Sequence, residues 1–241
     1  MEITIEIILL SLSVFLAVFT QSLAGFGVAL VAMALLPNLV GIKVAVPLVA
    51  LVALVLETIL SIRYRESFKI KTIWKMAFAS IIGIPIGVWA LKGMDELFAT
   101  RFLGIMIIVY AVYALFNFRL PRLRNPIWEP VVGFIAGLTG GALNIAGPPY
   151  IIYGNCRRWE MDEFKGNLQG LFVVNSLVVL ISHATSGNIT NTVWCYFLFT
   201  IPALIIGIFI GTSLDRYIHP ETFRKIVLIL LIFLSTRLIM G

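Results

Sequence analysis

The chain has 241 residues, of which 60% are hydrophobic and 12% charged, and its mean hydropathy is +1.03. A soluble domain carries about 25% charged residues, so this chain has too little polar surface to cover a water-soluble globule. The composition excludes a soluble nucleic-acid-binding module, a secreted disulfide scaffold and a disordered protein. We therefore predict an all-α polytopic membrane protein, and we attribute the formal net charge of +6 to basic cytoplasmic loops.

Membrane-spanning helices are predicted first, because each needs about 20 apolar residues. Six segments fit one crossing each: residues 44–62, 72–91, 101–118, 166–182, 193–214 and 222–240. Two further apolar segments, 3–37 and 129–154, contain glycine-rich interruptions at residues 20–27 and 139–149. Glycine and tandem proline disfavour a continuous helix. We expect each of these two segments to be a broken, re-entrant hairpin that returns to the side it entered.

The distribution of Lys and Arg supports the two hairpins. If all eight segments crossed once, the 18 basic residues would divide equally between the two sides. With two re-entrant hairpins, 14 of the 18 lie on the cytoplasmic side, as the positive-inside rule favours. This topology predicts a multi-pass protein of the cell inner (plasma) membrane with both termini outside.

An internal repeat is visible around the basic linker 119–128. Residues 71–74, Lys-Thr-Ile-Trp, recur as Asn-Thr-Val-Trp at 191–194. The predicted repeats, 1–118 and 129–241, each contain one hairpin followed by three spans. Because three crossings is an odd number, the halves are predicted to be inverted, which is a recurrent plan among transporters.

Two glycine pairs recur within this repeat. Gly83 and Gly87 are matched by Gly207 and Gly211, and Arg101 opens the following span as Arg224 does in the second half. Glycines four residues apart in a membrane helix allow close approach of a neighbouring helix. We predict that both pairs serve helix packing.

The two interruptions are the predicted binding site. Irregular backbone at membrane depth is tolerated only where it is buried in protein or lines a water-filled cavity. The N-terminus of a half-helix also presents N–H groups that suit an anion. The candidate substrate-binding residues are Gln21, Ser22, Gly25, Gly27, Thr139, Gly140, Gly141, Asn144, Gly147, Asn167, Gln169 and Asn175. Helix packing is the alternative role for the glycines, and interhelical hydrogen bonding is the alternative for the amides.

Glu57 is the only acidic residue well inside a predicted span, which makes it the candidate proton carrier. The alternative is that its side chain extends to the cytoplasmic boundary or pairs with Arg63 or Arg65. His183 falls at the outer end of a span and has no second ligand at metal-binding spacing. No catalytic or nucleotide-binding motif is present, so we predict no enzyme activity, no cofactor and no metal.

The glycine and proline pattern resembles a known family. Its residues are Gly25-Phe26-Gly27 with Pro37 downstream, the second copy at 137–141 leading to Gly147-Pro148-Pro149, and the helix entry at 43–46. These resemble the TauE/SafE family of sulfite and organosulfonate transporters. The resemblance implies a secondary transporter of a small sulfur-containing anion (sulfite, sulfoacetate or a related organosulfonate), working by alternating access with cargo where the hairpin tips meet. A passive anion channel and a non-transporting membrane sensor or assembly partner are the alternatives. Coupling to protons or sodium and homodimer formation are left open.

Overall fold

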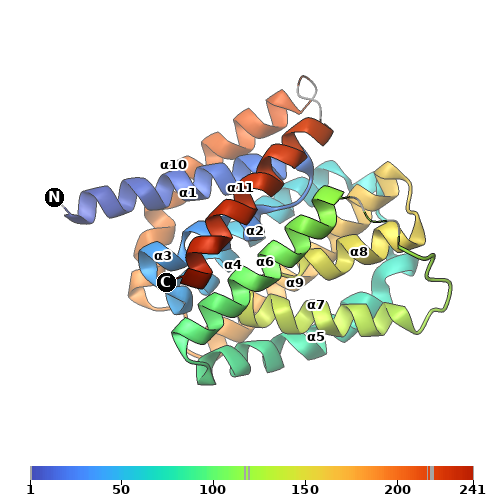
Figure 1. The fold of residues 1–241 in the computed structure, drawn as a ribbon, viewed down its shortest axis with the longest axis horizontal. Helices are drawn as coiled ribbons and strands as arrows, with labels where there is room; N and C mark the ends of the chain where they lie inside the picture. The colour runs from blue at the N-terminus through green and yellow to red at the C-terminus, as the bar shows by residue number, and fades with distance from the viewer. Residues whose placement is uncertain (1, 117, 119, 216, 218–219, 241) are drawn as a thin grey trace. The chain divides into compact units, whose positions relative to one another are not determined.

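The computed structural model describes residues 2–116, 118, 120–215, 217 and 220–240, and every regular element among them is a helix (Figure 1). The elements are α1 (Glu2–Ala24), α2 (Val28–Leu35), α3 (Pro37–Val40), α4 (Ile42–Arg63), the 3-10 turn η1 (Arg65–Ser67), α5 (Ile70–Gly93), α6 (Glu96–Phe116), α7 (Trp128–Leu143), α8 (Gly147–Arg157), α9 (Met161–Thr185), α10 (Asn191–Leu214) and α11 (Pro220–Met240). Arg119 and Arg216, two of the cations assigned to the cytoplasmic side, lie outside the described residues.

Six helices are long and apolar enough to cross a membrane: α1 over Ile5–Ala24, α4, α5, α6, α9 and α10. Five of these helices coincide with predicted spans, and their ends differ from the predicted ones by at most five residues. The sixth predicted span is helix α11, which has 21 residues and carries Arg224, Lys225 and Arg237.

Helix α1 differs from the predicted hairpin arm. It has 23 residues, about 34 Å at 1.5 Å per residue, and is long enough to cross a membrane alone. The interruption predicted at 20–27 is confined to residues 25–27, because the helix continues through Ala24 and α2 begins at Val28.

The second interruption is also shorter than predicted and covers residues 144–146. Pro148 and Pro149 were predicted to lie within the interruption, but the structure places them just after it. Both lie in the first turn of α8, where the missing proline N–H has no intrahelical partner to lose. Helices α7 and α8 have 16 and 11 residues and are too short to span a membrane, as a re-entrant hairpin requires.

The chain divides into two compact units, which are described separately. The first contains Met1–Val52, Met94–Phe118 and Asn188–Gly241, and the second contains Ala53–Gly93 and Arg119–Gly187. Each unit therefore combines segments from both predicted repeats. The repeat boundaries themselves stay a prediction.

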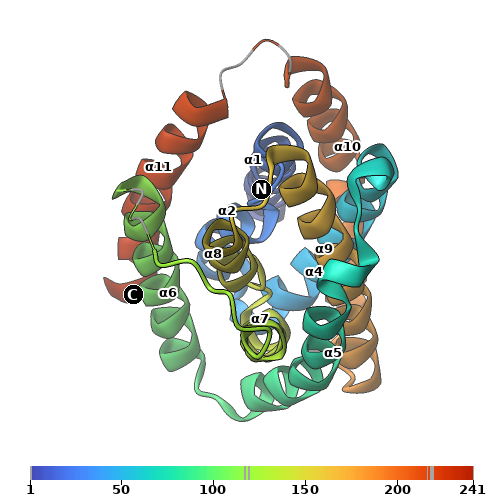
Figure 2. The same cartoon turned by 90° about the vertical axis from the view of Figure 1, so that its right-hand side faces the viewer.

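In the first unit, α1 packs along α10 and α6 packs along α11 (Figure 1, Figure 2). A Cβ atom added to Gly207 would lie 3.2 Å from the Phe15 carbonyl oxygen, and one added to Gly211 would lie 3.1 Å from the Phe19 carbonyl oxygen. From the first contact to the second, the position moves four residues forward on α10 and four residues forward on α1. The two helices therefore run in the same direction.

In the second unit, α5 and α7 pack closely and also run in the same direction (Figure 2). A Cβ atom at Gly83 would lie 2.6 Å from the Phe134 carbonyl oxygen, and one at Gly87 would lie 2.2 Å from the Leu138 carbonyl oxygen. Such distances leave no room for any side chain. The prediction that both glycine pairs serve helix packing is confirmed.

Candidate functional site

The first break, residues 25–27, is held by a side chain of the helix before it. Gly25 and Gly27 have φ values of 81° and 117°, a left-handed conformation that glycine adopts without strain. The Val28 backbone N–H donates to Gln21 Oε1 at 2.9 Å, so Gln21 caps α2 from within α1. Since Oε1 is fixed by this N–H donor, the buried Nε2 of Gln21 is the free end of the amide, and it has no hydrogen-bond partner among the described residues.

Ser22, the neighbour of Gln21, lies at a helix contact instead. Its Cβ atom would be 2.5 Å from a Cβ placed on Gly211 of α10. The Ser22 hydroxyl is buried without a hydrogen-bond partner among the described residues. Ser22 therefore contributes to the packing of α1 on α10.

The second break, residues 144–146, is closed by backbone and threonine hydrogen bonds. Asn144 has a φ of 56° and donates its backbone N–H to the Gly140 carbonyl at 2.8 Å. The Thr139 hydroxyl lies 2.7 Å from the Ile145 carbonyl, to which it can donate, so Thr139 supports the shape of the break. The Asn144 Nδ2 atom is buried and has no partner in the described part of the chain.

Asn175 of α9 lies beside this break, and its hydrogen bonds fix the orientation of its amide. Its Nδ2 donates to the Leu171 carbonyl at 2.9 Å and to the Tyr150 hydroxyl at 2.8 Å. Because a carbonyl only accepts, the nitrogen must face Leu171 and the oxygen must face the other way. Oδ1 lies 3.3 Å from the position of a Cβ on Gly140 and has no described partner. Asn175 therefore presents an acceptor beside the break.

The three glycines of the second predicted motif have different surroundings. A Cβ at Gly141 would lie 2.1 Å from the Ile84 carbonyl oxygen of α5, so Gly141 belongs to the α5–α7 contact. Among Gly140, Gly141 and Gly147, only Gly147 would give an added Cβ atom ordinary van der Waals distances, the nearest being 3.7 Å to Phe172. The geometry thus favours a packing role for Gly141 and leaves Gly147 open to the break.

Asn167 and Gln169 lie nearer the start of α9. Asn167 Oδ1 accepts the Lys69 backbone N–H at 3.1 Å, which anchors the α4–α5 connection. Eight residues separate Asn167 from Asn175, a rise of about 12 Å along the helix. The structure therefore does not bring Asn167 to the second break. Gln169 is buried on the same helix, with 1% of its surface exposed.

Glu57 is buried, with 5% of its surface exposed, and its Oε2 accepts a hydrogen bond from the Ser176 hydroxyl. The pair joins α4 to α9 within the second unit. Its side chain therefore packs against protein rather than lying on the molecular surface. The role of Glu57 as a proton carrier stays a prediction.

Sequence reasoning missed several residues at the breaks. His183 is fully buried and its ring hydrogen-bonds to the backbone of Gly141, at the end of α7. Tyr150 and Ser80 surround the Asn175 amide. Arg224 lies beside Phe26 of the first break. Only Arg224 had a usable signal, because it is a cation in the first turns of an apolar helix.

Neither a search of curated proteins nor a search of solved structures returns a match to the chain. Comparison with protein families does: the family described as Sulfite exporter TauE/SafE matches residues 10–238. The match covers both breaks and most or all of every long helix. With its apolar helices, the protein is a multi-pass membrane protein whose general function is transport, and the chain belongs to the TauE/SafE sulfite exporter family.

Proposed function

We propose that the protein is a secondary transporter of a small sulfur oxyanion, such as sulfite, sulfoacetate or a related organosulfonate. The observation that carries this proposal is a buried amide donor at each break, Gln21 Nε2 and Asn144 Nδ2, without a partner among the described residues. A buried donor left unpaired costs about 1–3 kcal/mol. An oxyanion that accepts from such donors forms charge-assisted bonds, which are stronger than neutral ones.

Asn175 has the opposite chemistry. Its bare Oδ1 accepts, so it repels an anionic oxygen and suits an N–H or O–H group or a cation. We therefore assign the anion contacts to Gln21 and Asn144, and assign Asn175 to a protonated group of the cargo or to a coupling ion.

We also propose that the two halves are inverted copies, and five features separated by 119 residues support this. The Thr20 and Thr139 hydroxyls both lie within hydrogen-bond distance of the carbonyl four residues earlier, Leu16 and Ile135. Gly25 and Asn144 both have positive φ and both donate their N–H to the carbonyl four residues earlier. Both breaks are three residues long, and the following helices begin at Val28 and Gly147. Alternating access by rocking of inverted repeats then follows the transporter plan.

The pairing of α1 with α10 and of α5 with α7 supports the same proposal. In each case the helix that precedes a break packs in parallel on a glycine pair from the other half of the sequence. The predicted meeting of the hairpin tips, the inner-membrane location and the outside termini remain predictions from the sequence.

Transport by the purified protein in lipid vesicles tests the proposed function. Flux is compared for sulfite, thiosulfate, sulfoacetate, taurine and small carboxylates, each against protein-free vesicles. We expect saturable flux of at least one sulfur oxyanion and weaker flux of the carboxylates. Flux that rises linearly with concentration for every anion would instead indicate a channel.

Substitution of Glu57 by glutamine tests the proposed proton coupling. The amide keeps an acceptor for Ser176 but cannot carry a proton, so an imposed pH gradient should no longer stimulate net sulfite flux. Exchange of internal for external sulfite should continue. Glu66→Gln, at an exposed acid of the adjoining η1 turn, is the matched control. A gradient response that survives Glu57→Gln would rule out this residue as the carrier.

A further inference from the structure

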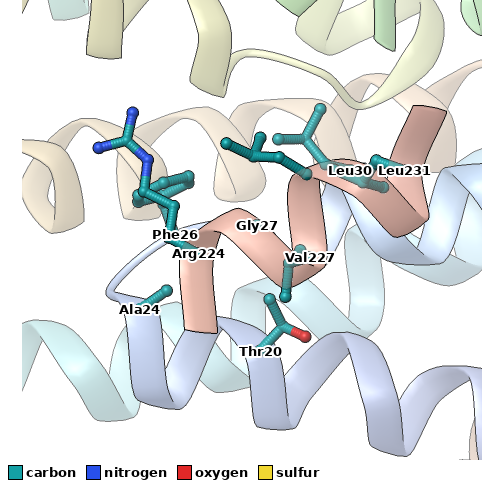
Figure 3. A pocket seen from close by; sticks show the side chains of 9 residues that line it. Thr20, Ala24, Phe26, Gly27, Leu30, Arg224, Val227 and Leu231 are labelled. Atoms are coloured by element: carbon teal, nitrogen blue, oxygen red, sulfur yellow. The ribbon is translucent and has the colours of Figure 1, made fainter. Parts of the chain in front are cut away.

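Arg224 lies at the first break. It is in the second turn of α11, and its guanidinium carbon is 5.6 Å from the centre of the Phe26 ring. Phe26 is the middle residue of the break, between two glycines with positive φ. Figure 3 shows the Arg224 side chain rising from α11 beside Phe26, at a small depression that Thr20, Ala24 and Gly27 also line. The arrangement lies entirely within the first unit.

In the part of the chain that the structure describes, the Arg224 charge has no anionic partner. No carboxylate among the side chains that the structure describes forms a salt bridge with Arg224. Its Nε atom is buried without a hydrogen-bond partner in that part of the chain. A partly desolvated cation in a membrane protein is costly unless an anion or a dipole compensates it.

A second donor lies near Arg224. Tyr110 of α6 is 2% exposed, its hydroxyl has no partner among the described residues, and it interacts electrostatically with Arg224. Arg224 and Tyr110 each bring a donor that has no acceptor among the described residues.

We propose that Arg224, with the Tyr110 hydroxyl, binds the oxyanion at the first break and is the charge that selects an anionic cargo on the cytoplasmic side. This assignment rests on the proposed transport of a sulfur oxyanion. The Phe26 ring lies within cation–π distance of the guanidinium, and an aromatic ring does not replace the hydrogen-bond acceptors that the guanidinium N–H groups require. The planar edge matches two oxygens of one oxyanion at once, which a lysine ammonium does not.

The side of the membrane follows from the sequence. The predicted topology places the start of α11, with Arg224 and Lys225, on the cytoplasmic side, so the proposed contact is made by cargo that enters from the cytoplasm. For an exporter this is the loading side. Lys225, the next residue, is also cationic but exposed, and it makes none of the contacts described for Arg224.

The experiment measures sulfite flux in phosphatidylcholine vesicles, started separately from the cytoplasmic and the outer face of the protein. Arg224→Gln should raise the half-saturating sulfite concentration on the cytoplasmic face by roughly 10- to 100-fold, since a charge-assisted contact is lost. The value on the outer face should change little. Arg224→Lys should fall between Arg224→Gln and the wild type, Tyr110→Phe should give a smaller loss, and Lys225→Gln should match the wild type.

Three outcomes overturn the inference while leaving the proposed transport intact. Arg224→Gln could behave like Lys225→Gln, both faces could change equally, or added phosphatidylglycerol could remove the difference between Arg224→Gln and the wild type. The last result would assign the site to a lipid phosphate. If the wild type carries no sulfur oxyanion, the proposed function fails. The site is then tested by whether sulfite raises the melting temperature of the wild type and of Lys225→Gln, raises that of Arg224→Lys by less, and leaves that of Arg224→Gln unchanged.

Discussion

Replacement of Gly87 by leucine is expected to prevent α5 from packing on α7. Even the first side-chain atom would lie 2.2 Å from the Leu138 carbonyl oxygen and 2.8 Å from the Ala142 nitrogen. Both of these atoms belong to the helix backbone, which cannot move aside as a flexible side chain can. Overpacking usually costs about 1–3 kcal/mol, and we expect at least this for a clash with backbone.

The matched control is on the same helix. Nothing lies within 4 Å of a Cβ at Gly93, so Gly93→Leu should leave the protein folded. The measurement is size-exclusion chromatography in detergent with thermal unfolding of the monodisperse fraction. Gly87→Leu should aggregate, and the milder Gly87→Ala should melt roughly 2–12 °C lower than the wild type. Equal melting of Gly87→Ala and Gly93→Ala would contradict the packing of α5 on α7.

This contact also changes how Gly141 variants are interpreted. Gly141 lies in the same contact with α5 through Ile84. Loss of transport in Gly141→Leu would therefore report a failure of packing rather than loss of a cargo ligand. Gly147→Ala, at an open position with a nearest neighbour 3.7 Å away, should fold normally.

Reversal of the amide donors at the breaks is expected to have the largest effect on transport. Asn144→Asp tolerates the left-handed backbone as asparagine does, and it replaces the free N–H donor with a carboxylate oxygen. Gln21→Glu keeps an acceptor for the Val28 N–H and removes the other donor in the same way. Each change loses a charge-assisted bond and adds a repulsive charge. Since such a bond contributes about 1.5–3 kcal/mol, we expect flux at low sulfite concentration to fall at least 10- to 100-fold.

Two controls separate this effect from misfolding. Asn144→Gly permits the same φ and removes the amide without adding charge, so it should lose less activity than Asn144→Asp. All four proteins, including the wild type, should elute alike in detergent. If Asn144→Asp and Gln21→Glu carried sulfite as well as the wild type, the anion site would lie elsewhere.

The helices and the existence of both breaks could be predicted from the sequence, because apolar segments of about 20 residues and clustered glycines have direct physical meanings. The lengths of the breaks could not. Gln21 and Ser22 were predicted to lie in the interruption, but both continue α1. A polar side chain that is buried against protein is compatible with a helix. The start of α9 extends beyond the apolar segment to Met161, since a helix does not end where the membrane does.

The roles within the site were harder to predict than the helices. Gly133, Gly137 and Gly141 are spaced four residues apart, as Gly83 and Gly87 are, and this spacing could have identified Gly141 as a packing residue. The partners of Asn175 and Glu57 carry no such signal. Tyr150 and Ser80 are distant in the sequence from Asn175, and Ser176 is distant from Glu57. Only the packing of α5, α8 and α4 against α9 brings the members of these pairs together.

Counterflow of labelled sulfite tests the proposed transport most directly. Vesicles that contain the protein are loaded with unlabelled sulfite and diluted into a trace of labelled sulfite. A carrier that exposes its site alternately exchanges the two, so the label should accumulate transiently above its equilibrium level, and Asn144→Asp should abolish the accumulation. Uptake no greater than in protein-free vesicles, or uptake without the transient excess, would contradict transport of sulfite by alternating access.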